Sequence, residues 1–123
     1  MQTILLADDS ATIRRAVEIA FHQELYAGEP FALIHVKSGA EALARARELH
    51  PSLVLADHSM PDQDGYALAS ALRDDPSTAA IPILMLSSKA SAYDEARGHS
   101  AGIAGHVVKP FDCQSLEIGR AHV

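Results

Sequence analysis

Short apolar runs alternate with amphipathic stretches along this chain. Apolar side chains fill most positions of residues 3–8, 31–36, 52–57, 81–88 and 104–109. Runs of this length are too short for buried helices, and they lack the polar alternation of a strand with one solvated face. The pattern therefore predicts five strands that are buried on both faces.

The segments between the apolar runs have the spacing of amphipathic helices. Residues 10–25 place apolar side chains at helical intervals behind Ser10, a good N-cap residue. A second helix begins with Ser38 and Glu41 in capping-box spacing, and it has to end before Pro51.

Three more helices are predicted over residues 65–75, over residues 92–100 and from residue 112 onward. Ser91 and Asp94 are candidate caps for the middle one. Buried strands that alternate with helices indicate a parallel sheet covered on both faces, joined by right-handed crossovers. The fold class expected is therefore a doubly wound α/β domain with five parallel strands.

Composition narrows the classes of function. The 123 residues are enough for one domain, and a formal net charge of −6 argues against a nucleic-acid-binding surface. The single cysteine, Cys113, excludes an intramolecular disulfide and fits a reducing compartment. No apolar run approaches the roughly 18 residues of a membrane span, and the N-terminus lacks signal-peptide features, so we expect a cytoplasmic protein without membrane contact.

Polar residues stand where the predicted strands end. They are Asp8 and Asp9, Asp57, Ser87 and Ser88, and Lys109. In an open parallel sheet the carboxyl ends of the strands meet at one edge, where such folds bind ligands. We therefore expect these side chains to converge.

The expected cluster has a distinct chemistry. Three carboxylates repel each other unless a cation lies among them. Mg²⁺, which takes one or two carboxylates and retains water, suits an open edge better than Ca²⁺. With a lysine and a serine hydroxyl nearby, the set suits a phosphoryl group, and a carboxylate there can act as the nucleophile that forms an acyl phosphate.

Each feature alone also has an ordinary structural explanation. An acidic pair after a strand commonly interacts with a helix N-terminus, and the stretch "PDQDG" at residues 61–65 is typical of a turn. A serine pair at a strand end is usually a cap, and a lysine before Pro110 usually lies at the surface. Their shared position at strand ends favours a common site.

The motifs "LLADDS", "LVLADHSMPDQDG", "PILMLSS" and "VVKPF" occur in this order over about residues 3–115. Together they resemble the receiver domains of bacterial two-component response regulators, in particular the chemotaxis-type receivers that stand alone. The resemblance implies a flavodoxin-like sheet of strand order 2-1-3-4-5. It also implies a phosphorelay switch whose partner is a histidine kinase or a phosphotransfer protein.

The resemblance assigns roles to individual residues. Asp57 would accept the phosphoryl group from the partner's phosphohistidine. Asp9, Asp57 and the backbone carbonyl of Ser59 would bind Mg²⁺ directly, with Asp8 acting mainly through water. Ser87 would donate a hydrogen bond to a phosphoryl oxygen, and Lys109 would pair with the phosphate.

Three positions depart from the family pattern or vary within it. His106 stands where relatives usually have a switching Tyr or Phe, so the output could respond to pH near neutrality; the alternative is a strand histidine without a switching role. Ser59 and Lys89 hold positions that tune the lifetime of the acyl phosphate. The other histidines, His22, His35, His50, His58, His99 and His122, show no metal-ligand spacing and are expected at the surface or at an interface.

The C-terminal residues 117–123 do not complete the apolar stripe of a last helix. As a peptide they match a reading frame of a common sequencing adapter, so we expect residues 1–116 to form the receiver domain and the tail to be non-native or incomplete.

Three alternatives remain open. A pseudo-receiver would keep the fold as an interaction module without phosphorylation, although the full set of site residues disfavours it. A haloacid-dehalogenase-type phosphatase would need its second acid two residues after the first, whereas Asp8 and Asp9 are adjacent. A flavin or nucleotide protein would need a glycine- or hydroxyl-rich first loop. We therefore expect a phosphoacceptor rather than a conventional enzyme.

Overall fold

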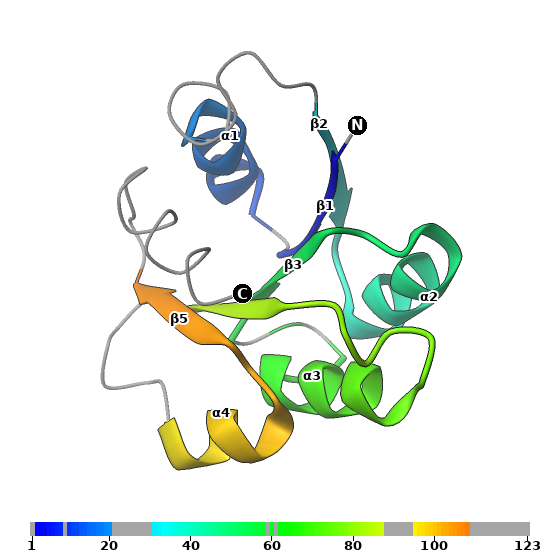
Figure 1. Ribbon diagram of the computed structural model, residues 1–123. Helices are drawn as coiled ribbons and strands as arrows, with labels where there is room; N and C mark the ends of the chain where they lie inside the picture. The colour runs from blue at the N-terminus through cyan, green and yellow to red at the C-terminus, as the bar shows by residue number, and fades with distance from the viewer. Residues whose placement is uncertain are drawn as a thin grey trace.

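The fold is described by a computed structural model that covers residues 2–8, 10–20, 31–58, 60, 62–87 and 95–108. Its centre is a parallel sheet of five strands: β1 (Gln2–Ala7), β2 (Phe31–Val36), β3 (Leu53–Asp57), β4 (Ile83–Ser87) and β5 (Gly105–Val108). The strand order is β2-β1-β3-β4-β5 (Figure 1). The predicted fold class and strand order are confirmed.

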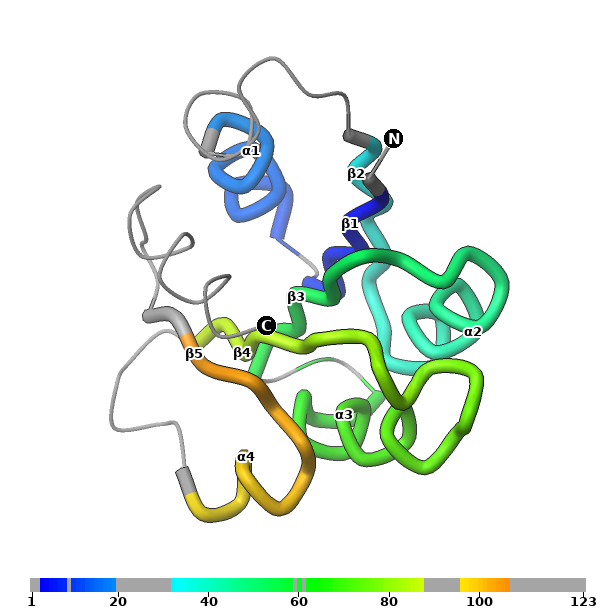
Figure 2. The backbone as a smooth tube through the Cα atoms, in the orientation of Figure 1, coloured from blue at the N-terminus to red at the C-terminus, as the bar shows by residue number. Residues whose placement is uncertain are grey.

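Helices cover both faces of the sheet. They are α1 (Ala11–Ala20), α2 (Gly39–Leu49), α3 (Gly65–Asp74) and α4 (Glu95–Ala101). Figure 2 shows α1 on one side and the other three helices on the opposite side, with α3 between α2 and α4. The connections are those of a doubly wound sheet.

Successive residues of the strands pack alternately into two hydrophobic cores. The core under α1 contains Ile4, Leu6, Val17, Leu53, Leu55, Leu84 and Leu86. The core under α2 and α3 takes the intervening strand residues, among them Leu5, Val54 and Met85. This alternation explains why the strands read as continuous apolar runs, since both of their faces are buried.

Polar caps begin the first two helices. Ser10 Oγ accepts a hydrogen bond from the Ile13 amide at 3.3 Å, as its sequence position predicts. Ser38 Oγ likewise accepts from the Glu41 amide at 3.2 Å. The Glu41 carboxylate, however, accepts from the Lys37 amide at 3.0 Å, one residue before the N-cap. In a regular capping box the Glu41 carboxylate would accept from the amide of the N-cap residue, Ser38; here it accepts from the amide of the residue before it.

Several strand boundaries differ from the sequence prediction by one or two residues, and two of them bear on the site or its surroundings. β1 ends at Ala7, so Asp8 lies just beyond the strand. β4 begins at Ile83, two residues later than predicted. The reason is Pro82, which has no N–H to donate to the ladder, although its carbonyl accepts a hydrogen bond from the Val54 amide at 3.0 Å.

Other predictions lie outside the described residues: the end of the first helix after residue 20, the Ser91 and Asp94 caps, and the helix from residue 112. Within the part of the chain that the structure describes, no helix is long and apolar enough to cross a membrane.

Candidate functional site

The site begins with two carboxylates at the ends of neighbouring strands. Asp57 is the last residue of β3, and Asp8 follows β1 directly. The register pairs Ala7 with Ala56, so Asp8 and Asp57 come one residue beyond a paired position. By strand alternation both continue the α1 side of the sheet, which Leu6 and Leu55 also face. Asp8 and Asp57 thus stand at the ends of neighbouring strands, at the same edge of the sheet.

Asp8 is fully buried and held by its surroundings. Its amide donates to the Val36 carbonyl at 3.1 Å, which joins the turn to β2. Its carboxylate accepts from the Ser10 amide at 2.8 Å, within the turn that leads into α1. The ordinary explanation of this acid, an interaction near a helix N-terminus, therefore holds alongside any role toward a ligand.

His35 is a neighbour of the site that sequence reasoning missed. Its Nε2 atom donates a hydrogen bond to the backbone carbonyl of Asp8. His35 lies on β2 opposite Leu6, near the same edge of the sheet. We expected a surface or interface histidine without a role at the strand ends; the side chain is partly buried. Its position next to the last residue of a predicted strand was the signal that could have identified it.

Ser87 and His106 lie on the next two strands. Ser87 is fully buried at the end of β4, where it is paired with Val108. His106 is partly buried on β5 and paired with Met85. Because side chains alternate along a strand, Ser87, Met85 and His106 belong to the same face of the sheet. Ser87 and His106 therefore lie on the same face of neighbouring strands, two residues apart in register.

The residues after Asp57 form the β3–α3 loop, residues 58–64, of which 58, 60 and 62–64 are described. Both oxygens of Asp62 accept hydrogen bonds from the first turn of α2, from the Gly39 amide at 2.8 Å and the Ala40 amide at 2.9 Å. These two bonds are the main cause of the lowered pKa of Asp62. A stretch expected to be a simple turn is thus attached to a distant helix.

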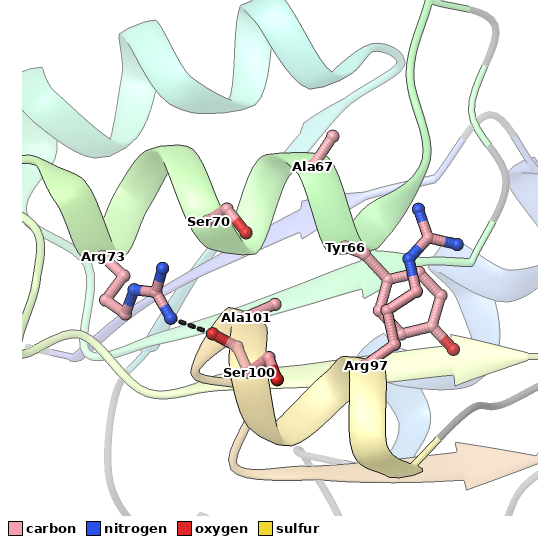
Figure 3. A pocket seen from close by; sticks show the side chains of 7 residues that line it. All are labelled: Tyr66, Ala67, Ser70, Arg73, Arg97, Ser100 and Ala101. Atoms are coloured by element: carbon pink, nitrogen blue, oxygen red, sulfur yellow. Dashed lines mark hydrogen bonds between the residues drawn. The ribbon is translucent and has the colours of Figure 1, made fainter.

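Asp64 and Tyr66 connect the other end of this loop to α4. Asp64 caps α3 by accepting from the Ala67 amide at 2.8 Å, and it pairs with Arg97 at 2.9 Å. The Arg97 guanidinium also lies over the Tyr66 ring, 4.3 Å from its centre, as Figure 3 shows. Tyr66 also packs edge-to-face against His58, the residue after Asp57. The side chains of Arg97, Tyr66 and His58 therefore form a continuous series of contacts from α4 to the residue after β3.

A pocket of about 340 Å³ opens between α3 and α4 beside this stack (Figure 3). Arg73 lines its far end and donates a hydrogen bond to the Ser100 carbonyl. The pocket is separate from the strand-end carboxylates, and none of the predicted site residues lines it.

Four predicted site residues, Asp9, Ser59, Lys89 and Lys109, lie outside the described residues. Among those that are described, no group of three or more His, Cys, Asp or Glu side chains could hold a metal ion. Asp8 and Asp57 nevertheless supply hard carboxylate oxygens from adjacent strands, and Mg²⁺ needs only one or two protein carboxylates. The donor set therefore fits Mg²⁺.

Comparison with known proteins decides the family. The family model of the response regulator receiver domain matches residues 4–118. The chain belongs to this family. Receiver domains of this family act in two-component signalling, where they interact with histidine kinases or phosphotransfer proteins. The family indicated by the four sequence motifs is thereby confirmed.

Relatives of this receiver differ in length. Protein PilG of Pseudomonas aeruginosa is 33% identical over 122 residues, which cover 98% of this chain and 86% of PilG. The probable transcriptional regulator ycf27 of Porphyra purpurea is 36% identical over 116 residues, 94% of this chain and 44% of that regulator. The receiver thus spans less than half of the ycf27 regulator.

Solved structures share the fold throughout. The chemotaxis response regulator CheY4 of Vibrio cholerae has a TM-score of 0.84 and 29% identity, covering 100% of this receiver and 99% of its own chain. The receiver domain of sensor histidine kinase PA1611 from Pseudomonas aeruginosa, which holds a magnesium ion in its active site cleft, has a TM-score of 0.81 at 24% identity and covers 98% and 95%. At that identity the second likeness supports the fold alone.

Proposed function

We propose that this receiver is a phosphoryl-accepting switch that is phosphorylated on Asp57. The observation that carries the proposal is the position of Asp57 at the end of β3, beside the buried Asp8, in a chain that matches the receiver family over residues 4–118. A histidine kinase or a phosphotransfer protein would be the donor. The match to the response regulator receiver domain over residues 4–118 supports this choice of partner.

The transfer step balances as an exchange of one bond for another. A carboxylate oxygen of Asp57 attacks the phosphorus of the partner's phosphohistidine, the P–N bond breaks, and its electron pair and a proton go to the imidazole. The product is an acyl phosphate on Asp57. Mg²⁺ held by Asp57 and the acids after β1 would neutralise the phosphoryl oxygens. The chain would promote its own phosphorylation and the hydrolysis of the acyl phosphate that results, and in this sense it is not a conventional enzyme.

Burial shapes the surroundings of the acceptor. Asp8 is fully buried and already oriented by the Ser10 amide, so its carboxyl group is held in place before a metal ion binds. Ser87, fully buried at the end of β4, supplies a hydroxyl for a phosphoryl oxygen. His106 would then report the state of Ser87, because both belong to one face of adjacent strands.

The test is chemical phosphorylation followed by intact-protein mass measurement. Incubation with phosphoramidate and Mg²⁺ should add one phosphoryl group to the wild type and none to Asp57→Asn. Asp75→Asn is the matched control, because Asp75 is another aspartate but lies at the end of α3. It should be labelled like the wild type.

Because a short-lived acyl phosphate escapes detection by mass, binding of beryllofluoride, a phosphoryl mimic, provides a second test. In the wild type it should shift the amide resonances of Ser87 and His106 in the presence of Mg²⁺, and Asp57→Asn should abolish the shift. A wild type that takes up neither phosphoryl group nor mimic would be a pseudo-receiver, and the proposal would then be wrong.

A further inference from the structure

The β3–α3 loop is anchored to α2 more firmly than a turn requires. Asp62 uses both carboxylate oxygens on consecutive amides of α2, Gly39 at 2.8 Å and Ala40 at 2.9 Å. In both bonds an amide at the positive end of the helix dipole donates to a charged carboxylate, and such hydrogen bonds are stronger than neutral ones. The loop and the helix are 22 or 23 residues apart in sequence, so the contact fixes two separate elements to each other.

Helix capping alone does not account for this contact. α2 already has its own N-cap, Ser38, whose Oγ accepts from the Glu41 amide. A helix N-terminus has several amides without partners, and local residues can satisfy them. Here the additional acceptor comes from the residues that follow Asp57. The contact therefore orders the loop as well as the helix.

Close packing supports the hydrogen bonds. A Cβ atom at Gly39 would lie 2.2 Å from Gln63 Nε2 and 2.4 Å from Gln63 Cγ. The Gln63 side chain thus lies in the space that a Cβ atom at Gly39 would take, and it would have to move to admit one. The residue next to Asp62 thus rests directly on the first turn of α2.

Backbone hydrogen bonds connect the β3–α3 loop to the end of β3, where Asp57 lies. The His58 amide donates to the Leu86 carbonyl of β4 at 2.7 Å, and the Gly65 amide donates to the His58 carbonyl at 3.1 Å. Inside the loop, the Met60 amide donates to the Gln63 carbonyl at 3.2 Å. The Asp62 side chain therefore acts on a loop whose backbone is hydrogen-bonded back to both ends.

The Met60 amide has a particular importance. It lies inside the loop, three residues after Asp57, and its hydrogen bond to the Gln63 carbonyl fixes this part of the loop backbone. A restraint at this point of the loop limits the movement of the strand end to which the loop is joined. The restraint depends on the Gln63 carbonyl, which directly follows Asp62 in the chain.

We infer that Asp62 is a positioning residue for phosphorylation: by clamping the β3–α3 loop to α2, it holds the loop backbone that follows Asp57, and with it the Asp57 carboxylate, in position for Mg²⁺. The inference rests on the proposed function of Asp57. Asp62 acts through the loop backbone and touches neither the metal ion nor the phosphoryl group. Groups that orient metal ligands in this way commonly change metal affinity by roughly 10- to 100-fold when they are removed.

The first variant to test is Asp62→Ala in the full chain. Mg²⁺ is titrated while the amide resonances of Asp8 and Asp57 are followed, and the rate of phosphorylation by phosphoramidate is measured against Mg²⁺ concentration. We expect the Mg²⁺ dissociation constant to rise roughly tenfold. At saturating Mg²⁺ the phosphorylation rate should return to near the wild-type value, because the nucleophile itself is intact.

Ser38→Ala is the matched control. It removes a hydrogen-bond acceptor from the same end of α2 without touching the loop, so it weakens the helix and should leave Mg²⁺ affinity unchanged. Asp62→Asn keeps one carbonyl acceptor in the same position, and its Mg²⁺ affinity should lie between those of the wild type and Asp62→Ala.

Two results would overturn the inference. One is an Asp62→Ala protein that binds Mg²⁺ and is phosphorylated like the wild type. The other is an equal loss of Mg²⁺ affinity in Ser38→Ala, which would assign the effect to helix stability. If the wild type itself neither binds Mg²⁺ nor accepts phosphate, the proposed function is wrong, and the positioning role is wrong with it.

Discussion

At the scale of single residues, the surroundings of Asp57 leave no room for a side chain at Gly65. Gly65 begins α3 directly behind the end of β3. A Cβ atom there would lie 2.7 Å from the carbonyl oxygen of Asp57 and 2.6 Å from Met85 Sδ. Met85 is fully buried, so it has little room to withdraw. The glycine in "PDQDG" is thus required by close packing against Asp57, in addition to any preference for a turn.

Gly65→Ala should therefore disturb Asp57. The added methyl group forces the Asp57 carbonyl or α3 to move, and overpacking of this kind costs about 1–3 kcal/mol of unfolding free energy. We expect slower labelling of Asp57 by phosphoramidate in protein that is still folded. Stability is measured by urea denaturation and labelling by intact mass.

Gly105→Ala is the control for this change, because its Cβ would meet only Leu84 Cδ2 at 3.4 Å, an ordinary contact. It should label at the wild-type rate. Equal labelling of Gly65→Ala and the wild type would show that the close contact behind Asp57 has no bearing on the acceptor.

At the scale of elements, the two acids of the β3–α3 loop serve different helices. Asp62 contacts the start of α2, whereas Asp64 caps α3 and pairs with Arg97 of α4. The sequence shows both acids only as turn residues in the same five-residue stretch. Their separate roles follow from the layer of helices that the sheet brings alongside the loop (Figure 1).

For Asp64 we expect capping to outweigh ion pairing. Asp64→Ala removes the acceptor for the Ala67 amide and should lower the unfolding free energy by about 1 kcal/mol. Arg97→Ala removes the ion pair and the contact with Tyr66, both at an exposed position, and should cost less, since exposed ion pairs contribute about 0–1 kcal/mol. Urea denaturation of both variants checks this order. An equal or larger loss in Arg97→Ala would show that α4 contributes more than the cap.

At the scale of the whole molecule, one sheet separates two cores. Leu55 lies in the core under α1, while Tyr66 lies in the core under α2 and α3. Because adjacent residues of each strand enter opposite cores, loosening one core disturbs the strands that form the other. The two cores should therefore unfold together.

Leu55→Ala tests this coupling. Leu55 is fully buried, and its truncation should cost about 2–5 kcal/mol of unfolding free energy. The transitions followed by far-UV circular dichroism and by the Tyr66 resonances should coincide, as two-state unfolding requires. Ile19→Ala, at a position that is 43% exposed, is the control and should have a small effect. Separate transitions would contradict a single cooperative unit.

The sequence by itself determined the strands, the helices and the carboxylate at the strand end. Buried parallel strands are continuous apolar runs, and the topology brings their carboxyl ends to one edge, so the residue pattern alone could place Asp8, Asp57 and Ser87 there. The hydrophobic pattern was sufficient because each of these features depends on local residues.

Only the tertiary structure decided which polar groups meet across the chain. The contact of His35 with the Asp8 carbonyl, the attachment of Asp62 to α2 and the pairing of Asp64 with Arg97 join residues 22 to 33 positions apart. A carboxylate in a turn can bond to its own loop or to any helix end nearby. Which of these partners it takes depends on how the layers pack, and no local pattern records that.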